Sequence, residues 1–515
     1  MKDRNLTFWF AIFACVALLG LALSSVSLWI DEGFIVWVVS HQTFAAIVQS
    51  ASSPYAPSPG DRQYPLYDLY IWAWIHVFGT NEIGMRVSNL PFGAIYVLGL
   101  AFTSRFAFQN RFAWIPFAFI PFVWFYLNEI RPYMMLSAFA CATVSALIIF
   151  AFGDRNVSER ALQLVVPFFL VAWLTHILAI LLMPAIILIS LSSTRFRRKP
   201  TLTPLIRLAV IWAVPFLLIA TYYATTLVGG AAGAELSNNN RGNSSLASLA
   251  EITYEQFGFG GLGPSRIALH ESVGFSAYKP YIAYIIFGIT GLFVAVYTGT
   301  RGNIQRTSIV LFAGWLISLS FATLASELTH ARFLGRHLAG TFPLLALAGI
   351  PLSRSRIAFM SLLAIFLVSD YRLSHVTVYT KDDYRAAVAA VLALNNDRPG
   401  TIDWAADDLT AGFYGLNLNF TRNDKTVHVP WHVNGHAIAV QNYPFADVKR
   451  LISKQQAGGK PVYLALSRPE IFDVNHGWRD MLKSVRPQFI THVQAFDVFE
   501  FTSFTAPKSS NLKER

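Results

Sequence analysis

The sequence has little charge and almost no cysteine. Only 13% of its 515 residues are charged, two are cysteines, and 54% are hydrophobic. Cys15 and Cys141 lie far apart inside apolar runs, so they give no disulfide framework and are expected to be packing residues. Such a composition is not that of a soluble globular protein. The chain is predicted to be an α-helical polytopic membrane protein.

The sequence also lacks the short motifs of several protein classes. It has no Walker-type phosphate-binding loop, which argues against an ATP-driven pump, and no Gly-x-Ser-x-Gly elbow, which leaves serine hydrolase chemistry without support. Paired DxD and HxxxH spacings are absent near the acids considered below, so no metal site is predicted, although carboxylates and histidines leave a divalent metal open. No internal repeat is visible.

Long apolar runs dominate the first three quarters of the chain. About eleven of them are candidate membrane spans, since a helix rises ~1.5 Å per residue. They cover residues 6–28, 87–103, 112–128, 132–152, 160–175, 177–193, 204–226, 280–299, 307–325, 338–352 and 356–372. Lys2 and Arg4 precede the first run as in a signal peptide, but the later runs favour a retained signal anchor.

Basic residues gather in every second turn between these runs. With the N-terminus inside, the inside turns contain Arg105 and Arg111, Arg155 and Arg160, Arg195 to Lys199, Arg301 and Arg306, and Arg354 and Arg356. In the short outside turns, Arg131 is the only arginine or lysine. This asymmetry follows the positive-inside rule and explains the net charge of +11 without nucleic acid. It predicts a cytoplasmic N-terminus and an extracytoplasmic C-terminal region.

The transmembrane domain, 1–372, is expected to have two large outside loops. The first, 31–86, includes the stretch 64–78, whose Trp and Tyr content favours an interfacial helix over a span. The second, 227–279, is rich in Gly, Asn and Ser around 229–245, which predicts a mobile flap rather than packed structure.

Charged residues return in the C-terminal region, 373–515, which predicts a small soluble α/β domain. Apolar patterns predict buried strands at 401–405 and 461–466 and two alternating strands within 490–501. Helices are expected at 384–394, 409–414 and 446–456.

Asp31 and Glu32 directly follow the first apolar run. A carboxylate at membrane depth is costly unless it meets a partner, a cavity or the interface, so the pair is a functional candidate. Alternatively, both acids cap a helix entered after Trp29, because acids complement the dipole at a helix start. The sequence leaves both roles open for Glu32 and favours function for Asp31.

A second candidate group lies in the short outside turn at 128–133. Glu129 and Arg131 are expected at the mouth of the helix bundle, with Tyr133 directly after them. Alternatively, the two charges pair with each other on the surface, where such a pair contributes little.

A third group precedes the tenth run. Arg332 and Arg336 are one helical turn apart, so both guanidinium groups face the same way, and their forked donors match a phosphate of a lipid headgroup. His330 and His337 accompany them. The alternative is that the arginines reach toward water or anionic lipid headgroups.

Several short motifs occur together in this order. They are Trp29-Ile30-Asp31-Glu32-Gly33, Gln63-Tyr64-Pro65-Leu66-Tyr67, Phe78-Gly79, Arg86 and Arg131-Pro132-Tyr133, followed more loosely by 332–351 and 384–387. Together they resemble the polyprenyl-phosphate-dependent membrane glycosyltransferases of the C superfamily (GT-C), namely the bacterial relatives of protein O-mannosyltransferases and the aminoarabinose lipid A transferase. The chain departs from the mannosyltransferases in having Gln63-Tyr64 before Pro65-Leu66 instead of His-Pro, and in Glu129 standing where relatives have Asp.

The resemblance implies a GT-C fold in a bacterial inner membrane and a sugar donor on a polyprenyl phosphate. It implies that Asp31 is the catalytic carboxylate and that Glu129 lines the same cavity. Asp31 would accept the proton of an acceptor hydroxyl, with inversion at the anomeric carbon. The expected substrate-binding residues are Glu32, Tyr64, Arg131, Tyr133, Arg332, Arg336 and His337. The acceptor, whether lipid, protein or polysaccharide, stays open.

Three other functions remain compatible with the sequence. A transporter or flippase of a lipid-linked or anionic substrate would use the same charges for binding alone, but it is typically built from inverted repeats with charges near mid-span. A ligase would transfer a preassembled glycan from a lipid diphosphate. A membrane-anchored binding module would recognise a glycan or a protein through its C-terminal domain.

Overall fold

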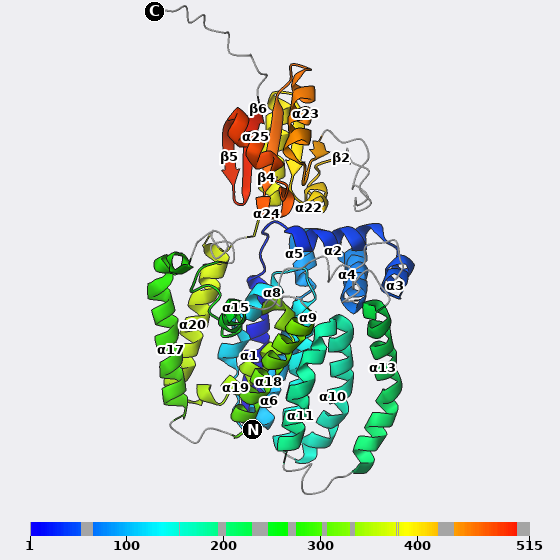
Figure 1. Cartoon of the computed structure of the whole chain (residues 1–515). Coiled ribbons are helices and arrows are strands. Elements are labelled where there is room, and N and C mark those ends of the chain that lie inside the picture. The colour runs from blue at the N-terminus through cyan, green and yellow to red at the C-terminus, as the bar shows by residue number, and fades with distance from the viewer. Residues whose placement is uncertain are drawn as a thin grey trace, which may run out of the picture. The chain divides into compact units, whose positions relative to one another are not determined.

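The computed structural model describes residues 2–52, 65–153, 155–193, 202–228, 246–265, 274–300, 306–329, 335–376, 379, 381–420 and 437–501. The chain divides into two compact units, and Figure 1 labels many of their elements. The transmembrane unit consists of Met1–Ser24 and Val38–Thr380. The α/β unit consists of Lys381–Arg515 together with the short N-terminal segment Ser25–Trp37. The segment that carries Asp31 and Glu32 therefore belongs to the α/β unit.

The transmembrane unit is built from helices. Its α-helices are α1 (Lys2–Leu21), α3 (Phe44–Ser52), α4 (Pro65–Phe78), α5 (Glu82–Val87), α6 (Leu90–Phe106), α7 (Ile115–Ala118), α8 (Pro121–Leu127), α9 (Tyr133–Phe152), α10 (Arg155–Thr175), α11 (Met183–Ser192), α13 (Leu202–Val228), α15 (Leu246–Gln256), α17 (Ile282–Thr300), α18 (Arg306–Thr329), α19 (Phe342–Gly349) and α20 (Arg356–His375). Short 3-10 helices are η1 (Ile177–Leu182), η2 (Gly274–Tyr281), η3 (Gly335–Leu338) and η4 (Leu352–Arg354). Helix α2 (Ile30–His41) begins in the α/β unit and continues into this one.

The predicted apolar runs are confirmed as helical segments. Among the described residues, five stretches are long and apolar enough to cross a membrane: Glu82–Phe106, Tyr133–Phe152, Ala277–Gly299, Arg306–Leu328 and Arg356–His375. Shorter apolar helices cover Asn5–Leu21, Ile115–Leu127, Ile177–Ser192, Trp212–Thr225 and Phe342–Arg354. The remaining run, 160–175, lies within α10. The stretch predicted as an interfacial helix forms α4.

Two of the predicted runs are shorter or broken in the structure. The first was expected to continue to residue 28, but α1 ends at Leu21 and no helix covers 22–29. The run 112–128 is divided between α7 and α8. The break comes at Ile120, which is extended (φ −67°, ψ 131°), because the residue before a proline is disfavoured in the helical region and Pro121 follows.

Close packing of small residues joins the central helices. Of the α9 span, 83% of the residues are buried, whereas the span that contains α17 is 11% buried and presents apolar side chains outward. Helix α6 approaches α9 at Gly99, where an added Cβ would lie 2.9 Å from Cys141 Sγ. Ser145 Oγ donates a hydrogen bond to the Gly99 carbonyl oxygen (3.0 Å). Such small residues let helices in a membrane pack backbone to backbone, so Cys141 is a packing residue, as predicted.

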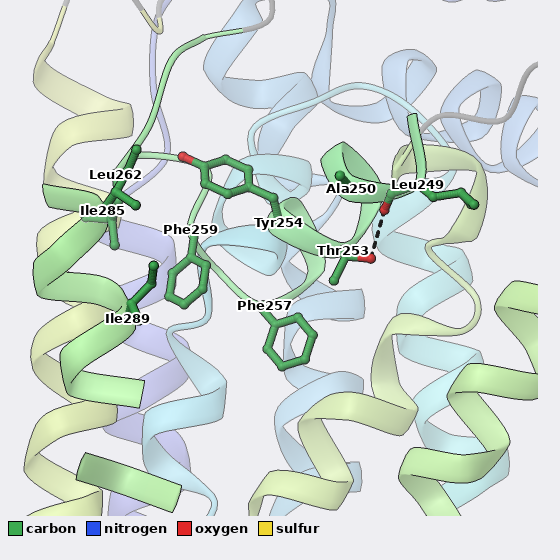
Figure 2. Close-up of a pocket in the computed structure, with 9 residues that line it drawn as sticks. All are labelled: Leu249, Ala250, Thr253, Tyr254, Phe257, Phe259, Leu262, Ile285 and Ile289. Carbon is green, nitrogen blue, oxygen red and sulfur yellow. Dashed lines mark hydrogen bonds between the residues drawn. The ribbon is translucent and has the colours of Figure 1, made fainter. Parts of the chain in front are cut away.

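The composition of the loop 227–279 predicts an unpacked segment, but part of this loop is packed. Its described part includes α15, drawn in Figure 2, and this helix is anchored by the buried Gln256. Gln256 accepts a hydrogen bond from Trp315 Nε1 (2.6 Å) and donates one to the Leu338 carbonyl oxygen (3.1 Å). The Gly- and Asn-rich stretch 229–245, on which the expectation rested, lies outside the described residues.

The α/β unit contains one six-stranded sheet in the order β2-β3-β1-β4-β6-β5. Its strands are β1 (Thr401–Ala405), β2 (Leu418–Phe420), β3 (Ala437–Ala439), β4 (Val462–Ser467), β5 (Gln488–Val493) and β6 (Phe496–Phe501). Strands β1 to β4 are parallel, and β6 runs antiparallel to β4 and β5. The helices are α21 (Tyr384–Asp397), α22 (Asp408–Phe413), α23 (Phe445–Gln456), α24 (Pro469–Phe472) and α25 (Gly477–Val485).

All four predicted strands and all three predicted helices of this unit are confirmed. The elements that were missed are β2, β3, α24 and α25. Strands β2 and β3 are three residues each, which is too short to show a period of two.

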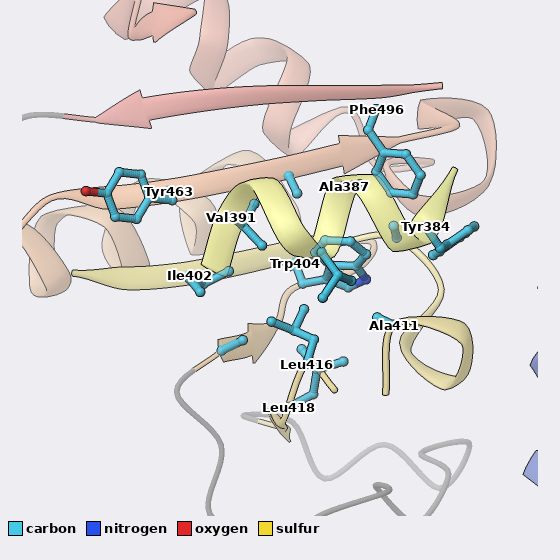
Figure 3. Close-up of a cluster of buried hydrophobic side chains, with 14 of the residues drawn as sticks. Tyr384, Ala387, Val391, Ile402, Trp404, Ala411, Leu416, Leu418, Tyr463 and Phe496 are labelled. Carbon is cyan, nitrogen blue, oxygen red and sulfur yellow. The ribbon is translucent and has the colours of Figure 1, made fainter. Parts of the chain in front are cut away.

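Aromatic side chains fill the core on one face of the sheet. The rings of Trp404 in β1, Tyr384 of α21 and Phe496 of β6 form a cluster (Figure 3). The ring centroid of Trp404 lies 6.3 Å from that of Tyr384 and 5.5 Å from that of Phe496, and the last two are 4.8 Å apart. Because side chains alternate along a strand, Asp403 points to the other face, which α23 covers.

Asp403 is a fully buried carboxyl group. Its Oδ1 accepts a hydrogen bond from Gln455 Nε2 (2.7 Å), and its Oδ2 has no hydrogen-bond partner among the described residues. Burial raises the pKa of Asp403 from 3.8 to about 7, in spite of the lowering effect of the Gln455 hydrogen bond. Between these values the unfolded chain has lost the proton that the folded chain still holds. The stability contributed by Asp403 therefore falls as the pH rises from about 4 to about 7.

We expect Asp403→Asn to remove this dependence, since asparagine keeps an acceptor for Gln455 and cannot ionise. Thermal melts of the full-length protein in detergent at about pH 5 and about pH 8 test this, and the melting temperature of the variant relative to wild type should rise between them. Asp447→Asn, at an exposed ion pair of α23, is the control. A variant that follows the wild-type pH profile would contradict the assignment.

Candidate active site

Asp31 and Glu32 occupy the first turn of α2. Glu32 is completely buried, and its Oε2 accepts a hydrogen bond from the backbone N–H of Trp29 (3.3 Å) and forms an ion pair with Lys381 Nζ (3.1 Å). The Trp29 contact is half of a capping box, in which a glutamate at the third helical position reaches back to the amide before the helix. The burial of Glu32 and its contact with the Trp29 amide fit the alternative in which this acid caps the helix. Asp31, in contrast, is partly exposed.

The α/β unit holds the whole segment that leads into α2. The Leu28 N–H donates to Tyr414 Oη (2.7 Å), and Ser27 Oγ accepts from the Arg385 N–H (3.2 Å). Gly33 lies directly against Thr410, so a Cβ at Gly33 would overlap the threonine hydroxyl. These contacts bring the first turn of α2 onto the first turn of α22.

A second acid, Asp407, interacts electrostatically with Asp31 at this contact. Asp407 caps α22, since its Oδ2 accepts hydrogen bonds from Thr410 N (2.7 Å) and Thr410 Oγ1 (2.5 Å). Burial and the neighbouring carboxylates of Asp408 and Asp31 together raise the pKa of Asp407 to about 7, against the lowering effect of the Thr410 hydrogen bonds. Asp31 is therefore a partly exposed carboxylate beside other acids, an environment that suits a proton acceptor.

In the transmembrane unit, hydrogen bonds from Arg86 and Asn89 hold the backbone of the turn that carries Glu129. Arg86 is completely buried, with Nε donating to the Asn128 carbonyl oxygen (3.0 Å) and Nη1 to that of Ser24 (2.7 Å). Asn89 Nδ2 donates to the carbonyl oxygen of Glu129 (2.5 Å). The motif residue Arg86 therefore shapes this turn through its backbone.

Glu129 and Arg131 are both buried, with 2% and 8% of their surface exposed, so the interpretation of a solvent-exposed surface pair is wrong. The Arg131 guanidinium lies 5.6 Å from the ring centroid of Tyr133, and its Nη2 is 3.4 Å from Tyr133 Oη. The ring of His176 lies 6.0 Å from that of Tyr133. His176 Nδ1 accepts the Leu178 N–H (3.1 Å), so Nε2 is the ring nitrogen that carries a proton. A buried arginine beside two further donors is suited to an anion.

Arg336 and His337 lie in η3, next to the elements that carry Arg131 and His176. Ser137 Oγ of α9 donates to the Ala339 carbonyl oxygen just after η3 (3.0 Å). A Cβ at Gly340 would lie 3.7 Å from Ala179 of η1. The structure thus brings the predicted groups around Arg131 and Arg336 into one region of the transmembrane unit. Tyr64, Arg332 and His330 lie outside the described residues.

An apolar pocket of about 410 Å³ lies between α15 and α17 (Figure 2). Its lining consists of Leu249, Ala250, Thr253, Tyr254, Phe257, Phe259, Leu262, Ile285 and Ile289. Most of these side chains are aliphatic or aromatic, so the pocket suits a hydrocarbon chain. Among the residues that the structure describes, no three His, Cys, Asp or Glu side chains lie in position to hold a metal ion.

No protein-family model and no curated protein matches the chain. The solved structures that align along nearly all of it include two of ArnT from Cupriavidus metallidurans. The apo structure has a TM-score of 0.41 and 14% identity, and the alignment covers 96% of this chain and 98% of that one. The structure bound to undecaprenyl phosphate has a TM-score of 0.41 and 13% identity, with 98% and 99% covered.

The sequence did not identify Lys381 and Asp407 as neighbours of Glu32 and Asp31, or His176 as a neighbour of Arg131. Lys381 is followed by Asp382, and Asp407 by Asp408, in stretches with no recognisable motif. His176 is a single histidine in a short turn, which by itself more often caps a turn than binds a ligand. Only the fold places these residues beside Glu32, Asp31 and Arg131.

Proposed function

We propose that this protein is a membrane glycosyltransferase of the GT-C type, which transfers a sugar from a polyprenyl phosphate to an acceptor hydroxyl outside the membrane. The observation that carries the proposal is the contrast between two adjacent acids on α2. Glu32 is buried and paired with Lys381, whereas Asp31 is partly exposed. The motif resemblance around both acids supports the same role for Asp31.

Asp31 acts as the general base. It accepts the proton of the acceptor hydroxyl as that oxygen attacks the anomeric carbon, and the bond from this carbon to the phosphate oxygen breaks. The electron pair leaves with the polyprenyl phosphate, and the configuration of the sugar inverts. No nucleotide and no oxidant is required.

Donors of the transmembrane unit, among them the buried Arg131, stabilise the leaving phosphate. Arg131 and Arg336 lie in one region of this unit, with His176 and Tyr133 adjoining Arg131. Fixed cationic donors aimed at a developing charge contribute more in a site that excludes water than in solution. Arg332 and Glu129 complete the proposed set, Glu129 as a further acid near the reacting sugar.

The apolar pocket of Figure 2 accommodates part of the polyprenyl chain. It lies beside α17, whose span is 11% buried and exposes Ile286 and Phe293. A lipid in the bilayer reaches such a pocket sideways, without passing through water. This supports a lipid-linked donor in a bacterial inner membrane over a soluble nucleotide sugar.

Purified full-length protein in nanodiscs, incubated with a panel of radiolabelled undecaprenyl-phosphate sugars and with lipid, peptide or polysaccharide acceptors, tests the proposal. We expect one donor to lose its label to an acceptor while undecaprenyl phosphate is released. Turnover of lipid-diphosphate glycans alone would favour the ligase function. Movement of intact donor across the bilayer without transfer would favour the flippase function.

A further inference from the structure

Lys381 lies at the centre of a chain of contacts that connects the sheet of the α/β unit to Asp31. Directly after β4, Arg468 forms a two-pronged ion pair with Asp382, with Nε 2.5 Å from Oδ2 and Nη2 2.7 Å from Oδ1. Both side chains are largely buried, and this pair fixes the backbone beside Lys381. Lys381 in turn pairs with Glu32 in the first turn of α2.

The ion pair between Lys381 and Glu32 is largely withdrawn from water. The side chain of Glu32 has no exposed surface and that of Lys381 has 13%, so neither charge is well solvated. The Lys381 ammonium also lies 6.0 Å from the centroid of the Trp29 ring, which covers it. A buried carboxylate that loses its cation must reorganise or take up a proton. The geometry of this helix turn therefore depends on Lys381.

We propose that Lys381 is a positioning residue for Asp31, acting through Glu32. The inference rests on the proposed function, in which Asp31 is the base. Asp31 and Glu32 are neighbours on one helical turn, so a displacement of the Glu32 carboxylate rotates the backbone that carries Asp31. The α/β unit, which looks from its sequence like an appended domain, is thereby part of the catalytic machinery.

The experiment compares four variants of the full-length protein: Lys381→Met, Lys381→Arg, Glu32→Gln, and Lys381→Met combined with Glu32→Gln. Arg450→Met, which removes an exposed ion pair in the same unit, is the control. Two quantities are measured. One is kcat and KM with the labelled undecaprenyl-phosphate sugar that is turned over fastest. The other is hydrogen–deuterium exchange of the amides of residues 27–33 without substrate.

We expect Lys381→Met to lower kcat by about 10- to 100-fold with KM changed by less than about 3-fold, because a small misplacement of a catalytic group has effects of this size. Exchange at 27–33 rises, while exchange in β1 and β4 stays at its wild-type rate. Lys381→Arg restores most of kcat, since it keeps the cation. The double variant loses no more than the worse single variant, because both act through one contact.

Unchanged exchange at 27–33 in Lys381→Met overturns the proposal, and so does a raised exchange with unchanged kcat. Additive losses in the double variant also overturn it, because Lys381 would then act independently of Glu32. The exchange arm needs no substrate. If it responds as expected while no donor is turned over, the proposed function fails and the structural coupling of Lys381 to α2 stands.

Discussion

Asp31→Asn is expected to reduce sugar transfer by about 10³- to 10⁴-fold, at the upper end of what a general base contributes. Asparagine has nearly the same shape as aspartate and still suits the start of α2, but it accepts no proton at neutral pH. Binding of the lipid-linked donor should be largely unchanged, since the proposed phosphate contacts lie elsewhere. Single-turnover transfer assays and donor binding, measured on the same preparation, check both expectations.

Two controls make this result specific. Asp447→Asn removes an exposed carboxylate of the same unit and should transfer sugar at the wild-type rate. Asp31→Glu keeps a carboxylate but moves it by one methylene, so it should retain part of the activity. Full transfer by Asp31→Asn would refute the assignment of the base and, with it, the proposed mechanism.

The second large effect is expected from Arg131→Met, which should lower kcat by about 10²- to 10³-fold, the usual cost of removing one donor to a developing anion. Arg131 is buried beside Tyr133 and His176. Water therefore cannot readily take the place of the guanidinium group and stabilise the phosphate when the arginine is removed. Arg131→Lys should recover only part of the loss, because an ammonium lacks the planar fork. The measurement is kcat with the labelled donor at saturating concentration.

Arg105→Met provides the matched control for this substitution. Arg105 is also in the transmembrane unit, but its guanidinium contacts Asn5 and the ring of Phe8 in a basic turn predicted to lie inside. We expect its removal to leave kcat unchanged. A loss with Arg105→Met equal to that with Arg131→Met would indicate general damage to the unit rather than a lost phosphate contact. Size-exclusion profiles and melting temperatures in detergent distinguish general damage to the unit from the loss of a phosphate contact.

Local patterns predicted most of the helices and strands. The helical runs and the strand at 401–405 depend on apolar spacing within single segments, and such spacing survives in any fold that buries it. Prolines explain the broken run at 112–128, whereas the three-residue strands β2 and β3 carry too little pattern to detect. The packed helix α15 was missed because its loop was judged by the glycine-rich stretch that precedes it.

The candidate site was predicted less completely. Asp31 and Arg131 stood out because charges at membrane depth are costly, and few charges adjoin the apolar runs on the side predicted to be outside. Their surroundings did not stand out. Glu32 pairs with a lysine 349 residues away in the sequence, and Arg131 lies near a histidine that no motif marks. Partners so distant in sequence leave no local pattern.

The sequence by itself determined that the chain is a helical membrane protein with an α/β region, and which few charges lie at the boundaries of its apolar runs. These properties follow from composition and spacing. An apolar segment favours burial whichever other segment it packs against, so its pattern can be recognised without knowing its partner. The tertiary structure decided that Asp31 belongs to the α/β unit, that Glu32 is a buried ion-pair partner, and that Arg131 is withdrawn from water. Burial and ion pairing are properties of contacts between distant segments, so only the folded chain distinguishes the exposed acid from its buried neighbour.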